Sequence, residues 1–403
     1  MPGIKEQIGV ELFLNDQPVP TGQSTYGTIQ VVETIKYVVP FLRFDLDDTT
    51  FKLADERQIT EGTKIKSRFY RFSDENKAPF SKFIVMRKPT GQRSPEGTTP
   101  QYWYAFLDAP EYWGKVEQMS VRGTSADVVT EVAGKCGLKP FVDPTADNQV
   151  WLNYNDTLAR FLKKTVAHGY VDNSSTMALA CTARHELLYR DLATIFKHKP
   201  KLRIIVGGPV GSFFSRFAAN IGFAGDGNAY GEDGVREVFG FQDRPSTNAG
   251  SSNAYMNYGY HQHYDDFGSV KSNQKYKAKK YFPNIHINPE LKAKIGLTRV
   301  DHYRMGFGNT HKKYVQAAYQ NSRGLALFSE QLIVMVNNLT DVRLFDVVDV
   351  RMFRSPDDAT LLHESGLYVV VIKSASMKNG RNYQEKLVLV RNGTFRKGDT
   401  PLL

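Results

Sequence analysis

The first 115 residues alternate between apolar and polar positions in short runs, and turn sequences such as NDQP and PTGQ separate the runs. An alternation with a period of two predicts half-buried β-strands. The runs are IGVELFLN, GTIQVVETIKYVV, FLRFDLDD, KIKSRFYRF, KFIVMRK and, after a Pro/Gly-rich loop, YWYAFLDA. About six such strands suffice for a small barrel or sandwich.

The run KIKSRFYRF shows this alternation most clearly. Its two faces carry Ile65, Ser67, Phe69 and Arg71 on one side and Lys66, Arg68, Tyr70 and Phe72 on the other. A strand that turns apolar groups to one side and cations to the other is expected to be half-buried.

At Gly123 the period changes to that of a helix. Thr124 to Asp127 matches the capping box, with Asp in place of the usual Glu. The apolar stripe that follows is Val128, Val129, Val132 and Cys136, with Gly137 as the expected stop.

A second short helix is expected after the turn PFVDPTADN and the strand VWLNY. Its cap is expected at Asn155 or Asp156, and its end at Gly169. Its apolar stripe is Leu158, Phe161, Leu162 and Val166. Residues from Met177 to Phe196 are expected to form a polar hairpin.

Between residues 199 and 308 the pattern is less regular. KLRIIV predicts a strand, and GGPVGSFFSRFAANIGFAG a loop with a short helix. From Gly225 to Tyr281 the chain is rich in Gly, Asn, Ser, Tyr and Asp, which predicts a long insertion or arm without a core of its own. Its many tyrosines indicate ordering against a neighbour.

Strand patterns return after Tyr314, in LALFSEQLIVMVNN, VVDVRMFR, GLYVVVIKSASMKNG and NYQEKLVLVRNG, where Asn379-Gly380 predicts a hairpin turn. We therefore expect a β-dominated α+β fold with two tube-like β-barrels. The predicted domains are a first barrel (1–115), an α/β insert (116–200), an irregular polar insertion or arm (201–310) and a second barrel (311–403).

Composition and charge add little to this picture. The chain has 403 residues and a net charge of 52 − 42 = +10, which suits an acidic partner, either nucleic acid or protein. Cys136 and Cys181 are the only cysteines, so neither a disulfide framework nor a metal-ligand spacing is present. We found no apolar run long enough to span a bilayer and no signal-peptide core, which favours a cytoplasm-type compartment.

Several residues invite a chemical interpretation, and each has a simpler one. His261, His263, Asp265 and Asp266 include metal-ligand types, but their spacing fits no established signature. Gly207-Gly208-Pro-Val-Gly211 lacks the residues of a phosphate loop, and His168, His185 and Glu186 favour structural roles. The pairs Asp47-Asp48 and Asp357-Asp358 are typical of turns rather than of glycosidase carboxylates. We assign no catalytic, cofactor-binding or metal-ligating residue.

A lysine-rich run indicates a possible polyanion contact. It consists of Lys271, Lys275, Lys277, Lys279 and Lys280, interleaved with Tyr276 and Tyr281. Such a run is typical of a nucleic-acid footprint, but also of a solvated face or of a contact with an acidic protein.

Three stretches resemble the tail-hub proteins of contractile phages, the late control D proteins and the type VI secretion spike proteins. They are TSADVVTEVAGKCGLKPFVD, NYNDTLARFLKKTVAHGYV and ARHELLYRDL. The residues that carry the likeness are Gly137, Leu138, Asp156, Phe161, Leu162, Gly169 and Tyr170. The C-terminal strands are similar to those that close a hub's second barrel, whereas the Gly225–Tyr281 insertion departs from a minimal hub.

The resemblance implies a structural virion protein, not an enzyme, and no cofactor. It implies a homotrimer whose six barrels match a hexameric tail tube above and meet a trimeric central spike below. Other baseplate proteins and the tape measure are further expected partners, and assembly is expected in the host cytoplasm. Because the chain ends at Leu403, a cell-puncturing part is expected on another polypeptide. The alternatives are a basic nucleic-acid-binding protein and a cell-wall hydrolase.

Overall fold

The structure of the protein is a computed structural model, which describes the chain in several segments. The described residues are 7–19, 26–36, 38–46, 59–73, 78–87, 93–94, 97–98, 101–172, 175–206, 229–230, 233–248, 260–264, 276–277, 299–302, 328, 330–355, 358–362 and 364–391. Strands dominate and a few helices accompany them, which confirms the β-dominated α+β fold. Among these residues no helix is both long enough and apolar enough to cross a membrane.

The N-terminal runs form a curved sheet, called here the first sheet. Its strands in spatial order are β1 (Ile8–Leu14), β5 (Lys64–Arg71), β6 (Ser81–Arg87), β9 (Gln101–Leu107), β4 (Phe41–Leu46) and β3 (Tyr26–Thr34). β2 (Gln17–Pro18) extends it beside β1, and β7 (Arg93–Ser94) and β8 (Gly97–Thr98) form a separate two-stranded sheet. All six predicted strands are confirmed. Their inward residues share one core, in which Ile65, Phe83 and Trp103 are buried.

The C-terminal strands complete a closed six-stranded barrel. Its strands in order are β24 (Gly366–Lys378), β25 (Asn382–Arg391), β21 (Glu330–Val336), β17 (Arg236–Asn248), β15 (Leu202–Val206) and β22 (Val347–Ser355), which pairs back to β24. β16 (Ala229–Tyr230) and β23 (Asp358–Leu361) extend it. The Asn379-Gly380 turn is confirmed, with φ of 52° and 64°.

Strand β15 explains why KLRIIV is an almost continuous apolar run. It pairs in parallel with both β17 and β22, and all five of its residues are buried. Strands buried on both faces need apolar residues at nearly every position. The exception, Arg203, forms ion pairs with its two cross-strand partners, at 2.8 Å to Glu237 and 2.8 Å to Asp349.

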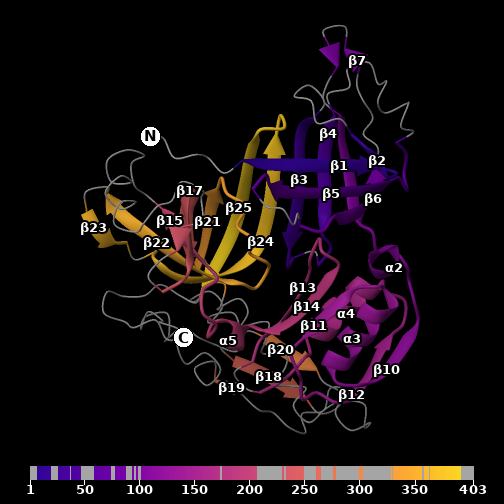
Figure 1. Ribbon diagram of the computed structural model, residues 1–403. Helices are drawn as coiled ribbons and strands as arrows, with labels where there is room; N and C mark the ends of the chain where they lie inside the picture. The colour runs from indigo at the N-terminus through magenta and orange to yellow at the C-terminus, as the bar shows by residue number, and fades with distance from the viewer. Residues whose placement is uncertain are drawn as a thin grey trace.

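The first sheet and the closed barrel are called here the two β units, and one hairpin belongs to both. The second half of β24, from Ile372 to Lys378, pairs with β3, and Ala375, Met377 and Tyr383 lie in the core of the first sheet. Figure 1 shows β24 and β25 running from the barrel to the first sheet. The strand pairings therefore join residues on both sides of the expected boundaries at 200 and 310, and the four-part division of the chain stays a prediction.

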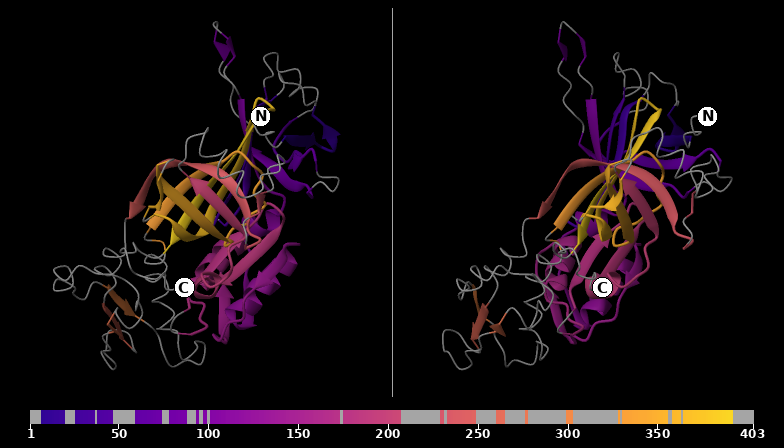
Figure 2. Two further views of the ribbon diagram at one scale, coloured as in Figure 1. Left: turned by 60° about the vertical axis from the view of Figure 1, so that its left-hand side comes forward. Right: turned by 90° about the vertical axis from the view of Figure 1, so that its left-hand side faces the viewer.

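The insert (residues 110–196) lies below both β units in Figures 1 and 2. Its elements are α2 (Pro110–Trp113), β10 (Met119–Gly123), α3 (Ser125–Lys135), β11 (Lys139–Val142), β12 (Gln149–Asn153), α4 (Leu158–Val166), β13 (Met177–Cys181), β14 (Glu186–Asp191) and α5 (Leu192–Ile195). β10 pairs with β12, and β11 and β13 both pair with β14.

Helix α3 follows the prediction closely. Thr124 and Asp127 form the capping box, and Val128, Val129 and Val132 are fully buried. At the other end Gly137 has φ of 65°, and the Leu138 N–H donates to the Ala133 carbonyl at 2.9 Å. This is the Schellman arrangement that a left-handed glycine permits.

Four predictions for the rest of the insert were wrong, and the fourth concerns Gly169. The cap of α4 is Thr157, not Asn155 or Asp156, because the Asn153 side chain holds the backbone of Asp156 outside the helix. PFVDPTADN contains a strand, β11, because β14 offers it a parallel edge. The β13–β14 hairpin is buried rather than polar, since it forms the floor of the insert core.

Gly169 lies beyond the end of α4, which stops at Val166, and does not cap it. A Cβ at Gly169 would lie 2.0 Å from the hydroxyl of Tyr189 and 3.2 Å from Oγ of Ser125. That hydroxyl contacts Ser125 Oγ at 2.8 Å, and Ser125 donates to the buried Asp147 carboxylate at 2.6 Å. Glycine is needed here because a buried polar network approaches the backbone.

We expect Gly169→Ala to destabilise the protein by about 1–3 kcal/mol, because the new methyl group must displace Tyr189. Gly134→Ala is the matched control: a Cβ at this position in α3 meets nothing within 4 Å. It should stabilise the helix by about 0.5–1 kcal/mol. Urea unfolding measures both changes. Adding Tyr189→Phe to Gly169→Ala should recover part of the loss, and equal effects of the two alanine variants would contradict the close approach.

Candidate functional site

Of the residues that invited a chemical interpretation, the structure brings His261 opposite Tyr276 on one small sheet and describes few of the others. His261 and His263 lie on β18 (Tyr260–Tyr264), which pairs with β19 (Tyr276–Lys277) and β20 (Arg299–His302). Lys277 and Tyr276 form β19, and Asp358 begins β23. The following lie outside the described residues: Asp47, Asp48, Gly207, Gly208, Gly211, Asp265, Asp266, Lys271, Lys275, Lys279, Lys280, Tyr281 and Asp357.

His185 and Glu186 are neighbours in sequence but turn to different partners. His185 Nε2 lies 3.2 Å from the carbonyl oxygen of Asp108, and Glu186 accepts from Thr182 and Arg343. They form no acid–base pair. Over the described residues no group of three or more His, Cys, Asp or Glu side chains could hold a metal ion.

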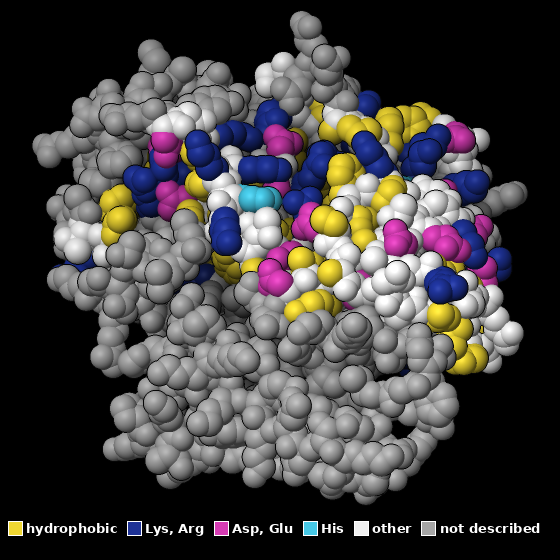
Figure 3. All heavy atoms as spheres, turned by 90° about the horizontal axis from the view of Figure 1, so that it is seen from below, with side chains coloured by type: hydrophobic (Ala, Val, Ile, Leu, Met, Phe, Trp, Pro, Cys, Tyr) yellow, Lys and Arg dark blue, Asp and Glu magenta, His cyan; other side chains and the backbone are white. Residues whose placement is uncertain are grey.

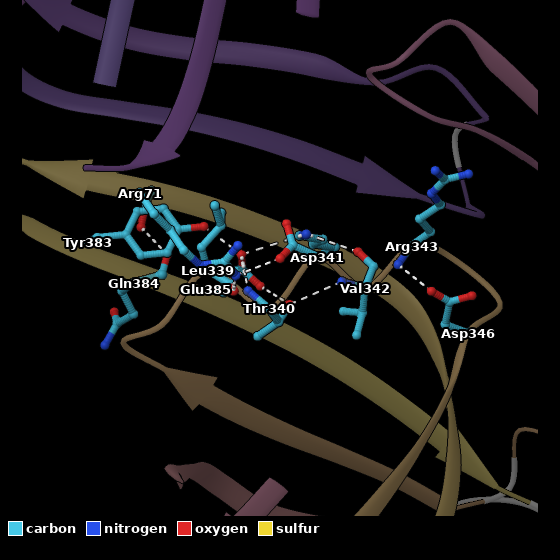
Figure 4. A network of polar contacts seen from close by, with 12 residues as sticks. Arg71, Leu339, Thr340, Asp341, Val342, Arg343, Asp346, Tyr383, Gln384 and Glu385 are labelled. Carbon is cyan, nitrogen blue, oxygen red and sulfur yellow. Dashed lines mark hydrogen bonds and ion pairs between the residues drawn. The ribbon is translucent and has the colours of Figure 1, made fainter. Parts of the chain in front are cut away.

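The polar residues that do converge lie where the first sheet, the closed barrel and the insert meet. At the centre is the link, residues 337–346, which joins β21 to β22 (Figure 4). Sequence reasoning missed it, because the link has no periodicity and its partners lie far away in the chain. Its polar residues between two strongly apolar strands, among them Thr340, Asp341 and Arg343, are the only hint of a role.

Two arginines hold the same point of the link from different sides. Arg71 of β5 donates through Nη2 to the Leu339 carbonyl and, at 2.5 Å, to the Asp341 carboxylate. Arg236 of β17 donates through Nη1 to the same carbonyl at 3.0 Å and lies 3.4 Å from the same carboxylate. Arg71 thus extends from the first sheet to a segment of the barrel, and the aromatic contact of Phe69 with Tyr383 lies beside it.

Glu385 of β25 anchors the link from within. Its carboxylate is fully buried and accepts from the Thr340 N–H at 3.1 Å, the Thr340 hydroxyl and the Tyr383 hydroxyl at 2.5 Å. Lys373 Nζ lies 3.6 Å from it and donates to the Val342 carbonyl at 2.9 Å. A buried carboxylate is tolerated because hydrogen bonds and a cation replace its hydration.

The insert is bound to the same place by two further contacts. Arg343 lies 3.2 Å from Glu186 of β14, and the Ala183 N–H donates to Glu33 of β3 at 2.6 Å. Desolvation raises the pKa of Glu33, although Lys373, its cross-strand partner, opposes the shift. One cluster of contacts therefore connects all three parts.

The joint is the set of contacts that Arg71, Arg236, Glu385, Glu33 and Glu186 make around the link. It also contains strained backbone. Val38, His185, Asp341 and Phe345 have φ between 59° and 69°, and the first three contact a different part of the fold from their own. A left-handed conformation costs about 1–3 kcal/mol for a residue other than glycine, and a β-branched residue such as Val38 rarely adopts it. Val38 is buried in the insert core although it belongs to the β3–β4 turn. Packing of Val38 into another part of the fold therefore holds it in this conformation.

Many charged side chains at the joint form ion pairs. In Figure 3 Lys and Arg side chains gather in a band on the face seen from below, with Asp and Glu between them. Among the described residues, Lys201 pairs with Asp346 at 2.7 Å and Arg351 with Asp349 at 3.2 Å.

We expect Glu385→Leu to cost about 3–5 kcal/mol, because it leaves the Thr340 N–H and two hydroxyl groups without their acceptor. Gln384→Leu is the control, since Gln384 is the preceding residue on β25 and is only half-buried. Thermal unfolding of both variants measures the difference. A loss below about 1 kcal/mol for Glu385→Leu, an ordinary surface effect, would contradict the anchoring role.

The half-buried His185 should make the stability of the protein depend on pH. Burial lowers the pKa of His185, so below its ordinary value of 6.5 the unfolded chain binds a proton that the native state resists. Stability should therefore fall as the pH drops from about 7 to 5, by no more than ~1.4 kcal/mol per pH unit for one proton. His185→Asn, which tolerates the left-handed backbone, should flatten this dependence. His198→Asn, at an exposed histidine, should not; identical slopes in both variants would refute the assignment.

No protein-family model and no curated protein matches the sequence. Solved structures do match along almost the whole chain. The tail protein from Neisseria meningitidis MC58 aligns with a TM-score of 0.56 at 10% identity, covering 96% of this chain and 98% of that one. The 43 kDa tail protein of prophage MuSo2 from Shewanella oneidensis aligns with a TM-score of 0.53 at 10% identity, covering 96% and 97%.

These alignments include the first sheet, the insert and the closed barrel, because they leave out only a few per cent of the chain. The similarity to phage tail proteins that the sequence indicates is confirmed at the level of the fold.

Proposed function

We propose that this chain is a structural protein of a phage tail, and that it is the central hub of a contractile-tail baseplate. The observation that carries the proposal is the end-to-end likeness to two tail proteins, whose lengths the chain covers by 98% and 97%. A hub needs a rigid scaffold rather than a reactive cleft. The paired charges at the joint support this, because ion pairs between the parts hold them in fixed positions.

The proposed assembly is a homotrimer that adapts a hexameric tail tube to a trimeric central spike. Each chain would supply two β units at a fixed mutual angle, so that three chains present six in a ring. The shared β24–β25 hairpin supports this, because it prevents one unit from turning against the other. Ring closure would use the same two surfaces on each chain, as heterologous contacts in a closed ring do.

The remaining parts of the proposal follow from this position in the tail. The partners would be the spike, the tube or tube-initiator protein, other baseplate proteins and the tape measure. The protein would be a virion component, assembled in the host cytoplasm, and would have no enzymatic activity. The nucleic-acid alternative rests on the lysine run, of which only Lys277 lies among the described residues.

Mass photometry of the purified protein, alone and with spike and tube proteins, tests the trimer. We expect a mass of three chains, each of 45.6 kDa, either at once or after the spike is added. A monomer that persists with both partners present would contradict the hub. Binding to duplex DNA that weakens steeply with salt would favour the alternative.

A further inference from the structure

The outer face of the first sheet is aromatic where a solvent-facing sheet is expected to be polar. On β9 the inward residues Trp103 and Ala105 are buried in the core, at 1% and 0% exposure. The alternate residues Tyr104 and Phe106 point outward and are each 37% exposed. An antiparallel sheet with one solvated face normally alternates apolar and polar residues, so β9 departs from the pattern over consecutive outward positions.

The strand register makes these side chains one continuous surface. Phe106 pairs with Phe41 of β4 on one side and with Ile84 of β6 on the other, and Ile84 pairs with Lys64 of β5. Met86 of β6 adds a further side chain that is 36% exposed. Single exposed apolar residues need no explanation, whereas a patch that crosses three strands does.

The aromatic groups of this surface are already fixed in place. The ring of Phe106 meets Trp113 of α2 edge-to-face at 5.6 Å, and Trp113 Nε1 donates to the Leu107 carbonyl at 2.8 Å. The Arg43 guanidinium lies 3.9 Å above the ring of Tyr102. Tyr, Trp, Met and Arg are the types enriched in protein interfaces, and the rings of Phe106 and Tyr102 are already held by these contacts. They lose little conformational entropy when a partner binds.

One side of the patch carries excess positive charge. Lys66 of β5 stands directly opposite Lys82 of β6, and Lys64 precedes them on the same face. Asp16 forms an ion pair with Lys66, and all three lysines lower the pKa of its carboxyl group, with Lys66 contributing most. Three lysines and one aspartate leave a charge of 3 − 1 = +2. Like charges directly opposite on a sheet are destabilising, so a carboxylate from outside would be favourable there.

We propose that this face, formed by outward residues of β4, β9, β6 and β5, docks a protein surface with an apolar centre and carboxylates at its rim. Lys64, Lys66 and Lys82 contact the carboxylates at the rim of the partner surface, and the aromatic side chains of β9 contact its apolar centre. Nucleic acid fits less well, because base stacking needs open rings and the Arg43 guanidinium already lies over the ring of Tyr102. The identification of the partner as a neighbouring tail protein rests on the proposed function. The expected chemistry of the partner surface follows from the face itself and is independent of that function.

A random copolymer of glutamate and tyrosine, poly(Glu,Tyr), is the test probe, compared with polyglutamate and with the oligonucleotide (dT)20. Fluorescence anisotropy should show tighter binding of the copolymer than of polyglutamate. Tyr104→Ser with Phe106→Ser should weaken copolymer binding by about tenfold, as the loss of interface aromatics does. Lys64→Glu with Lys82→Glu should weaken it and reduce its salt dependence.

The controls are an exposed aromatic and an exposed lysine elsewhere, Phe241→Ser on β17 and Lys199→Glu. Both should bind like the wild type, and all variants should melt at similar temperatures. Equal loss in the controls, no loss in the paired variants, or tighter binding of (dT)20 through the same residues would each overturn the proposal. If the trimer test failed, binding of the copolymer would still support the docking face. If the copolymer did not bind, the docking face would be refuted and the proposed trimer would be unaffected.

Discussion

The backbone of strand β24 is the constraint on which the rest of this structure depends. Its first half pairs with β22 and closes the barrel, its second half pairs with β3 and extends the first sheet, and β25 follows it along both halves. Each N–H and C=O of a buried strand must find a partner. Moving one β unit against the other would break ladder hydrogen bonds, so the two behave as one body.

The joint around the link makes that arrangement specific. Backbone pairing alone would permit a twist between the units, but Arg71, Arg236 and Glu385 each need a particular position of residues 339–342. Removing one partner of such a buried polar group costs far more than the group contributes in net stability. The insert is attached to the two β units through Glu186 and Glu33. The residues Val38 and His185, which have left-handed backbone, lie at its contacts with them.

Local patterns predicted local structure well in this chain. The alternation in KIKSRFYRF placed Ile65 inward and Lys66 outward, and the capping box and Gly137 delimited α3. What failed depends on distant residues. PFVDPTADN forms a strand only because β14 lies beside it, and Gly169 is required only because Tyr189 approaches it. The joint could not be predicted, since Arg71 and Asp341 are 270 residues apart and neither has a recognisable motif.

The central claim is that three copies of the chain, each with its first sheet and closed barrel held rigidly together, close a ring. Cryo-electron microscopy of the purified protein bound to its spike tests it most directly. The account predicts a threefold ring around a channel, with six β densities alternating between closed barrels and first sheets, and the hairpin β24–β25 bridging each pair within one chain. Single chains bound to the spike, or rings in which the two β units of a chain take variable relative orientations, would contradict it.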